Sequence, residues 1–461
     1  MRLLKNNLGE DKIFPLILKL AIPSMLAQFV NVLYTIVDRF FVAKIPGIGD
    51  LALASVGVAA PITTLIMSFA FLVGLGGAPL MAIKMGEQNN KTAERILFNC
   101  TVCLVTVSAM LMLVFYLCKS YFLMWFGASG QTFPYADEYL TYYLIGTIFA
   151  VCGLGLNSFV TAQGYSALSM TIIIISALTN ILLDYVFIMI MDMGIKGAAI
   201  ATVIAQAVSF SCLVGFLISK RPKIRIRIQK LSFKIIKKVM AMGFGPFFII
   251  STDSVLIIVL NSIMQRTGGA ANGDLYLSAI TITLAFMQLI TGPLGGITLG
   301  CQPIISYNFG AQNTKRVRKA LGGVVAVCLS FSLIMTFVSL FASSSFAGIF
   351  TKDEKVLNLA TEWIKYYTAG ILFLSVQYAL VDSLVALGSP VISAGLSFNR
   401  KLVIVLLTAL LPMGIGAKGA VLGEPIGDVY SMIISAIFFI FIIGKLLKKR
   451  ENLAVVKEES D

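Results

Sequence analysis

Long apolar runs recur along this chain, from Phe14 to Ile443, and they constrain its fold more than any other feature. Each run is long enough to cross the roughly 30 Å hydrocarbon core of a bilayer. The runs lack the alternation of polar and apolar residues found in membrane β-strands, so helices must satisfy the backbone polar groups in lipid. The sequence therefore predicts an all-α integral membrane protein with about twelve transmembrane helices.

The composition agrees with this class. The chain has 461 residues, of which 58% are hydrophobic and 13% are charged, and a soluble protein could not cover so much apolar surface with polar groups. The first apolar run is too long for a cleavable signal peptide, so we expect it to be a membrane helix. The expected helices cover 14–42, 51–81, 95–118, 137–161, 169–190, 196–219, 240–264, 275–303, 317–343, 356–387, 393–412 and 419–444.

The net charge of +14 is explained by membrane topology. Basic residues fall mostly on alternate connections, with the densest group at Lys220–Lys238 and smaller groups such as Arg400 with Lys401. The positive-inside rule places these connections, and with them both termini, in the cytoplasm. We therefore expect a multi-pass protein of the inner (plasma) membrane, and we interpret the basic stretch as a helix flank rather than a nucleic-acid-binding segment.

Cysteine and histidine usage argues against metal and redox chemistry. The chain has 7 cysteines and no histidine. Cys100 and Cys103 form a C-x-x-C motif inside an apolar run, without further ligands nearby, so we interpret them as packing residues. Without histidine, proton chemistry is left to carboxylates. No phosphate-binding GxxxxGK[ST] loop or paired catalytic motif is present, so we expect neither an ATPase nor another enzyme, and no cofactor.

An internal duplication divides the chain. GEQNNK at Gly86–Lys91 matches GAQNTK at Gly310–Lys315, and further matches follow in the same order at a nearly constant spacing. Each repeat holds six predicted helices, so both halves enter the membrane from the same side, as in secondary transporters. A duplicated bundle without transport is the alternative. The expected domains are an amino-terminal six-helix lobe at 1–219, a basic cytoplasmic linker at 220–238, and a carboxy-terminal six-helix lobe with its tail at 239–461.

Oxygen-bearing residues in the first half form a candidate ion site. A carboxylate at the centre of a membrane helix costs roughly 2.5–3.5 kcal/mol, so each one needs a reason. Asp38, Asn180, Asp184 and Thr202 lie at similar depths near the outer ends of three predicted helices. An all-oxygen set suits a hard cation, and two close carboxylates would also share a proton. We expect Na⁺ or H⁺ to bind here, unless Asp38 only caps its helix or pairs with Arg39.

The second half carries different candidates. Asn261 stands at the position matching Asp38, so the first site is not duplicated. Asp253 and Asp382 lie within predicted helices, with Tyr378 one turn before Asp382 on the same face. We expect them to form a substrate site or a second cation site; the alternative is that neighbouring Ser, Thr and Tyr groups simply satisfy the two carboxylates.

The last predicted helix adds two acidic residues. Glu424 and Asp428 are one turn apart, and both are candidates for lining a cavity, although Pro425 disturbs the helix between them. The acidic residues within predicted helices favour a cationic cargo over an anionic one.

Four segments carry a resemblance to a known family. They are Leu33–Val42 (LYTIVDRFFV), Gly86–Lys91, Asn180–Asp184 (NILLD) and Gly194–Thr202 (GIKGAAIAT). Their order and spacing resemble the multidrug and toxic compound extrusion (MATE) family. The resemblance implies two six-helix lobes around a central cavity, and export of organic cations driven by inward Na⁺ or H⁺ flow.

The resemblance also implies roles for particular residues. Asp38, Asn180, Asp184 and Thr202 match an amino-lobe cation site, and Asp253 and Asp382, with Tyr378, look like an acidic pair that some members use. The implied partners are the lipid bilayer and small organic cations, and we expect a monomer. A flippase of lipid-linked precursors or polysaccharides, from the same superfamily, is the alternative; it would favour a large basic cavity.

Overall fold

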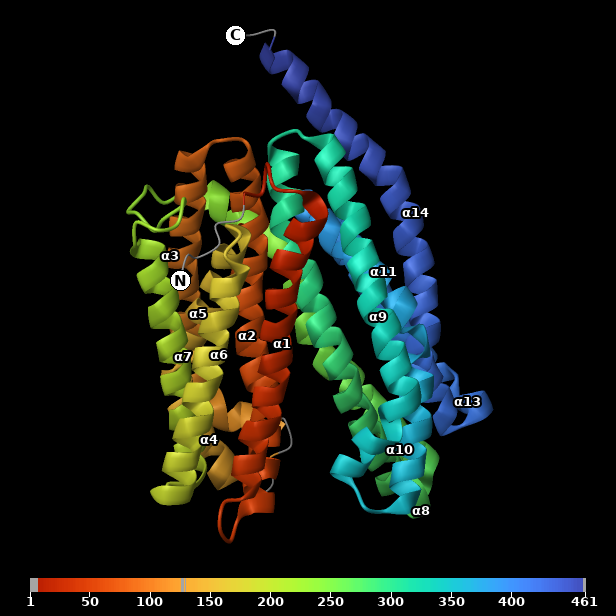
Figure 1. Ribbon diagram of the computed structural model, residues 1–461. Helices are drawn as coiled ribbons and strands as arrows, with labels where there is room; N and C mark the ends of the chain where they lie inside the picture. The colour runs from red at the N-terminus through yellow and green to blue at the C-terminus, as the bar shows by residue number, and fades with distance from the viewer. Residues whose placement is uncertain (1–6, 126–127, 129, 459–461) are drawn as a thin grey trace. The chain divides into compact units, whose positions relative to one another are not determined.

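The computed structural model describes residues 7–125, 128 and 130–458, and within these ranges every regular element is a helix (Figure 1). A few side chains inside helices, those of Asp253 and Asn261 among them, lie outside the described part. Ten of the described helices are long and apolar enough to cross a membrane, or eleven if the bent pair α4 and α5 is one span. The predicted all-α membrane class is confirmed.

The helices follow the predicted apolar runs closely, with η1 a π-helical turn and η2 a 3₁₀ turn. In chain order they are α1 (Ile13–Ala43), α2 (Gly49–Gly86), α3 (Asn90–Trp125), α4 (Phe133–Ile145), α5 (Thr147–Ala162), α6 (Ser166–Asp184), η1 (Tyr185–Ile190), α7 (Gly194–Ile218), α8 (Phe233–Gly310), α9 (Thr314–Phe350), α10 (Glu354–Tyr367), η2 (Thr368–Gly370), α11 (Ile371–Ala386), α12 (Pro390–Leu410), α13 (Pro412–Ile415) and α14 (Ala417–Glu458).

The structure adds two features that the predicted helix bounds lacked, at Gly146 and at Gly269. The run expected as one helix at 137–161 is broken at Gly146, where α4 and α5 meet at 57°. The two helices expected at 240–264 and 275–303 are both present within α8, which is kinked at Gly269, where the backbone is not helical, with φ 56° and ψ −160°. Only glycine adopts such a backbone conformation readily, so the chain turns there without a loop.

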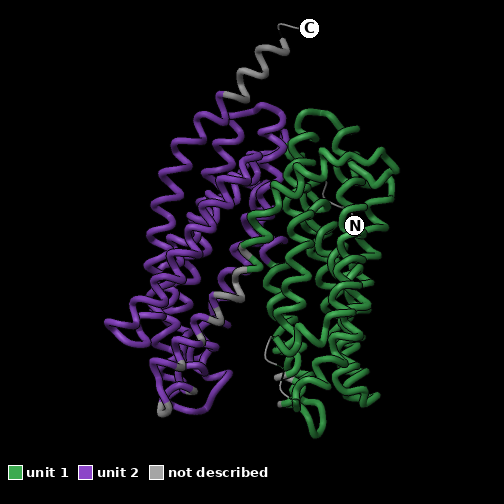
Figure 2. The backbone as a smooth tube through the Cα atoms, turned by 180° about the vertical axis from the view of Figure 1, so that it is seen from behind, with its two compact units in different colours: residues 1–8, 26–251 green, residues 9–25, 252–461 purple. Residues whose placement is uncertain are grey.

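Backbone contacts divide the described chain into two compact units (Figure 2). Among the described residues, unit 1 contains 7–8 and 26–251, and unit 2 contains 9–25 and 252–458. The division therefore runs through α1 and α8, and residues 220–238, predicted as a linker between the lobes, fall within unit 1. The first part of α8 belongs with the amino-terminal helices, and the first part of α1 belongs with the carboxy-terminal ones.

Glycine residues lie where the first part of α8 packs in unit 1 and where the first part of α1 packs in unit 2. In unit 1, a side chain at Gly76 of α2 would meet the backbone of Val239 and Gly243 in α8. In unit 2, a side chain at Gly300 of α8 would meet Ser24 and the backbone of Leu20 in α1. Glycine allows helix backbones to approach this closely, which is the usual basis of helix association in membranes.

The basic stretch before α8 is held against unit 1. Asn99 in α3 accepts a hydrogen bond from Ser232 N at 2.7 Å, and Arg95 Nε donates to Lys230 O at 3.1 Å. Gln163, after α5, accepts from Ile224 N at 2.9 Å. The segment expected as a linker is thus anchored by polar side chains of the first repeat.

Candidate functional site

The four residues predicted as an ion site come together within unit 1. Asp38 lies on α1, Asn180 and Asp184 on α6, and Thr202 on α7. Asp184 and Asn180 are fully buried, Thr202 is nearly so, and Asp38 is half-buried. The carboxyl groups of Asp38 and Asp184 are in hydrogen-bonding contact, and Arg39 adds a weaker through-space attraction on Asp38. The carboxyl of Asp38 thus faces Asp184.

Asn180 connects the acid pair to α7. In the orientation that matches its neighbours, its Nδ2 donates to Asp184 Oδ2 at 2.8 Å and its Oδ1 accepts from Thr202 N at 3.1 Å. Thr202 Oγ1 donates to Ala198 O at 3.0 Å, one turn earlier in α7. The amide therefore fixes the distance between α6 and α7 at the depth of Asp184.

Three tyrosines surround the acid pair, and the sequence analysis did not single them out. Tyr34 lies one turn before Asp38 on α1, and its hydroxyl is hydrogen-bonded to Thr202. Tyr139 and Tyr143 of α4 are buried, and their rings stack with centroids 5.9 Å apart. The spacing of Tyr34 and Asp38 on one helix face was the signal that could have identified the first of them.

One oxygen of the acid pair is unsatisfied. Asp184 Oδ1 is buried and has no donor among the described protein atoms. Two carboxyl groups in contact repel each other unless a proton or another cation lies between them. The backbone also changes here, because α6 ends at Asp184 and the π-helical turn η1 begins at Tyr185. Such turns are frequent at functional sites, and the arrangement is suited to binding and releasing one positive charge.

The candidates expected in the second half are less closely connected. Asp382 on α11 is half-buried and is hydrogen-bonded to the Thr298 side chain on α8. Tyr378, one turn earlier, interacts electrostatically with Arg400. The side chain of Asp253 lies outside the described residues, so its expected pairing with Asp382 stays a prediction.

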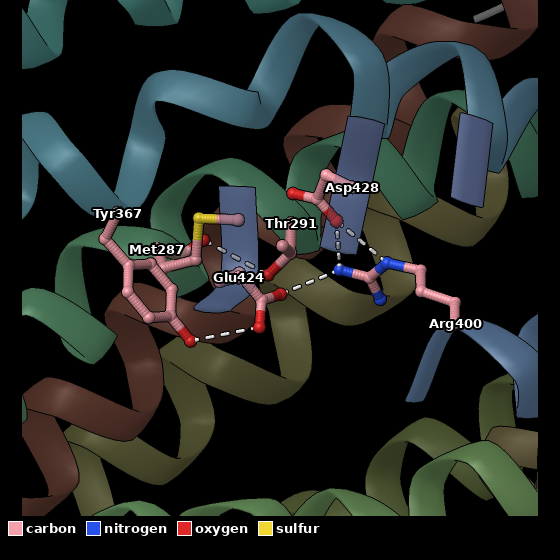
Figure 3. A network of polar contacts seen from close by, with 6 residues as sticks. All are labelled: Met287, Thr291, Tyr367, Arg400, Glu424 and Asp428. Atoms are coloured by element: carbon pink, nitrogen blue, oxygen red, sulfur yellow. Dashed lines mark hydrogen bonds and ion pairs between the residues drawn. The ribbon is translucent and has the colours of Figure 1, made fainter. Parts of the chain in front are cut away.

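A buried ion-pair cluster occupies the interior of unit 2 (Figure 3). Arg400 Nε donates to Asp428 Oδ1 at 2.9 Å, and its Nη2 donates to Glu424 Oε1 at 2.7 Å and lies 2.8 Å from Asp428 Oδ1. The Tyr367 hydroxyl donates to Glu424 Oε2 at 3.3 Å. Exposure of the three charged residues is between 0% and 6%.

This cluster corrects the sequence interpretation of Arg400. The sequence analysis counted it with Lys401 among the basic residues of a cytoplasmic connection, but it lies in the middle of α12 and is buried. Pairing with acids of α14 makes a buried arginine tolerable in a membrane helix. The pairing could not be read from spacing, since the partners are on another helix.

The cluster stands at positions equivalent to part of the unit 1 site. Where GIKGAAIATVI from Gly194 matches GAKGAVLGEPI from Gly416, Thr202 corresponds to Glu424. In the same register Gln206 corresponds to Asp428. EYLTYYLIG from Glu138 matches EWIKYYTAG from Glu362, which pairs Tyr143 with Tyr367. Both units thus carry polar residues at the same helix positions, and on the matching helices α7 and α14 they are neutral in unit 1 and acidic in unit 2.

Comparison with known proteins identifies the family. The MatE family model matches residues 23–186 and 250–411. The multidrug export protein MepA of Staphylococcus haemolyticus is 22% identical over 390 residues, covering 82% of each chain. The outward-facing structure of a multidrug resistance MATE family transporter of the MOP superfamily has a TM-score of 0.89 at 20% identity, covering 97% of this chain and 98% of the other.

A second structural neighbour has a different reported character. It is a MOP superfamily transporter from Pyrococcus furiosus, described as having a binding pocket of reverse polarity that suggests a different function. Its TM-score is 0.88 at 20% identity, over 96% of this chain and 98% of that one.

Because the family model matches more than half of the sequence, we conclude that the chain is a multi-pass membrane transporter, not an enzyme, and belongs to the MatE family of multidrug efflux proteins.

Proposed function

We propose that the chain is a secondary active exporter that moves small, mostly cationic organic compounds out of the cell in exchange for inward Na⁺ or H⁺. The observation that carries this proposal is the contact between the carboxyl groups of Asp38 and Asp184, with Asp184 Oδ1 buried and lacking a donor. A buried pair of acids attracts a cation more strongly than an exposed pair does, because the low dielectric constant of the interior strengthens the electrostatic attraction.

Helix α1 provides a route from ion binding to a change of shape. Asp38 is on the part of α1 that belongs to unit 1, whereas residues 9–25 belong to unit 2. Pro23 lies inside the helix just before the change from one unit to the other. Proline removes a backbone hydrogen bond and permits bending. Binding of a cation at Asp38 would therefore alter the bend of a helix shared by both units.

Transport by purified protein in liposomes tests the proposal. We expect a fluorescent organic cation to move against its gradient when an opposing Na⁺ or H⁺ gradient is imposed, and varying one ion at fixed concentration of the other identifies the driving ion. Asp184→Asn should reduce ion-driven transport to the level of empty liposomes while leaving folding intact. Asp192→Asn, the same chemical change at an exposed position after η1, is the matched control. Full activity of Asp184→Asn would remove the unit 1 site from the mechanism.

The flippase alternative differs in the charge expected around the cargo. It would favour a basic cavity, but Arg400, the buried basic residue among those described, is held by two acids. If a broad panel of organic cations is not transported while a lipid-linked anionic precursor is, the flippase reading replaces the exporter.

The membrane, topology and assembly expected from sequence complete the proposal. We propose insertion in the inner (plasma) membrane with both termini cytoplasmic, and action as a monomer in the bilayer. A tag at either end should resist protease added outside intact cells, and the purified protein in nanodiscs should have the mass of one chain. External cleavage of the tag, or the mass of two chains, would contradict these points.

A further inference from the structure

The cluster around Arg400 supports an inference that does not depend on the unit 1 site. We propose that Arg400, Glu424 and Asp428 form a second cation-binding site, in unit 2, which takes one monovalent cation, either a proton or Na⁺. The ligand would be held at Asp428 Oδ2, the carboxylate oxygen of the cluster that has no partner among the described atoms.

The count of charges is the first argument. Two carboxylates contact a single guanidinium, and all three side chains are buried. A purely structural ion pair in a membrane protein needs one acid for each base, since an uncompensated buried charge is costly. The second acid leaves the contact group with one excess negative charge, which a single bound cation would neutralise.

An unsatisfied oxygen gives the position of that charge. Asp428 is fully buried. Its Oδ1 accepts the hydrogen bond from Arg400 Nε and forms the ion pair with Nη2, whereas its Oδ2 has no partner among the described atoms. Figure 3 shows this second oxygen directed away from the guanidinium. Ser431, one turn further along α14, is also buried with an unpartnered Oγ. A buried carboxylate oxygen with no donor is rarely left without a ligand.

The surrounding elements supply few competing charges. Tyr367 of α10 donates to Glu424, and Tyr378 of α11 interacts with Arg400. Lys401, next along α12, attracts Asp428 through space, as the weakest of the influences on it. From α8, Met287 and Thr291 lie beside the cluster, and Thr291 donates to Met287 O at 3.1 Å. Apart from Lys401, these neighbours carry no positive charge.

Direct cation binding to the full-length chain in nanodiscs tests the proposal. The background carries Asp38→Asn and Asp184→Asn, which remove the carboxyl pair of unit 1. Proton uptake on acidification is followed with an indicator dye, and Na⁺ binding with radioactive Na⁺. We expect one cation per chain to persist in this background. Saturable Na⁺ binding identifies Na⁺, and proton uptake that Na⁺ does not alter identifies a proton. If neither persists, the proposal is overturned.

Variants that remove a negative charge or a positive charge from the cluster show whether the retained cation binds there. Asp428→Asn or Glu424→Gln should each abolish its binding, because the remaining acid forms a neutral pair with Arg400. Both variants keep one ion pair and nearly the same side-chain volume, so either one suffices if the other does not fold. Arg400→Gln should instead tighten binding about tenfold or more, because it removes a positive charge from the same site. Unchanged binding in both acid variants would place the cation elsewhere and overturn the proposal.

Lys401→Gln decides whether that side chain already balances the cluster. We expect it to leave the number of bound cations unchanged. If the background binds no cation until Lys401 is replaced, Lys401 supplies the missing charge and the cluster is a structural network without a ligand.

Discussion

The two units carry polar groups at matching positions but handle charge in opposite ways. In unit 1, two carboxyl groups on α1 and α6 contact each other, and the α7 positions that correspond to the acids of unit 2 hold the neutral Thr202 and Gln206. In unit 2, the matching positions on α14 are Glu424 and Asp428, and Arg400 joins them from α12. In the register that pairs Gly164 with Gly388, Arg400 corresponds to Ser176.

The difference in charge predicts that the two halves of the duplication respond differently to ions. Carboxyls without a bound basic partner respond to the ion concentration, because a cation is what neutralises them. Carboxyls with a permanent guanidinium are already mostly neutralised, so they contribute more to stability and exchange at most the remaining charge. We therefore expect unit 1 to be the more ion-responsive half, and substitutions at equivalent positions to have unequal effects.

The largest difference in stability loss is expected between substitutions of Arg400 and of Ser176. Arg400→Gln leaves two buried carboxylates facing each other and should lower the free energy of unfolding by about 3–5 kcal/mol. Ser176→Ala removes only the hydrogen bond from Ser176 Oγ to Ala205 O, at 2.8 Å, for about 1 kcal/mol. Thermal unfolding of both variants in the same detergent measures the difference. Equal losses would mean that the arginine is not needed to neutralise the acids.

The next comparison is between alanine substitutions of Gly76 and Gly57, both on α2, of which only Gly76 packs against α8. Gly76→Ala places a methyl group against the backbone of α8 and should cost about 1–3 kcal/mol by overpacking. A methyl group at Gly57 meets nothing within 4 Å, so Gly57→Ala should be neutral or stabilise the helix by up to about 1 kcal/mol. Melting temperatures of the two variants check this. If Gly76→Ala melts like Gly57→Ala, close packing of α8 on α2 does not hold unit 1 together.

Much of this architecture was predictable from the sequence, because each level had a local signal. Apolar runs predicted the helices, and repeated motifs predicted the duplication. The side chains of Asp38, Asn180, Asp184 and Thr202 could be grouped because all lie near the outer ends of their helices. The structure brings these four together.

Other features had no local signal. The exchange of α1 and α8 between units depends on which helix faces touch, and an apolar run does not specify its neighbours. The break at Gly146 lies inside the run that the sequence predicts as one helix, 137–161. In the sequence, Arg400 looks like a basic residue that sets membrane topology, because its acid partners lie on another helix, α14. Pairing across helices is set by packing, so the sequence does not predict which acids Arg400 contacts.

A smaller inequality is expected between the paired tyrosines. The Tyr367 hydroxyl donates to a carboxylate of Glu424, and the Tyr143 hydroxyl is hydrogen-bonded to the neutral amide of Gln206. A bond to a charged group contributes more than a neutral one, so Tyr367→Phe should cost about 1.5 kcal/mol or more and Tyr143→Phe about 1 kcal/mol or less. Denaturation midpoints of the two phenylalanine variants provide the measurement. The reverse order would show that Glu424 does not carry its charge in the folded protein.

The smallest effect is expected at the ends of α7 and α14, where the repeats are most alike. Lys196 lies over the ring of Tyr142 at 4.9 Å, and its counterpart Lys418 lies over Tyr366 at 5.7 Å and also pairs with Glu362 at 2.8 Å. The Lys418 pair is exposed, so water and salt screen it. Lys196→Gln and Lys418→Gln should therefore melt within error of each other and of the parent at physiological salt. A salt-independent loss confined to Lys418→Gln would show that the Glu362 pair matters to unit 2 as a buried pair does, and the contrast drawn between the interiors of the two units would then extend to their ends.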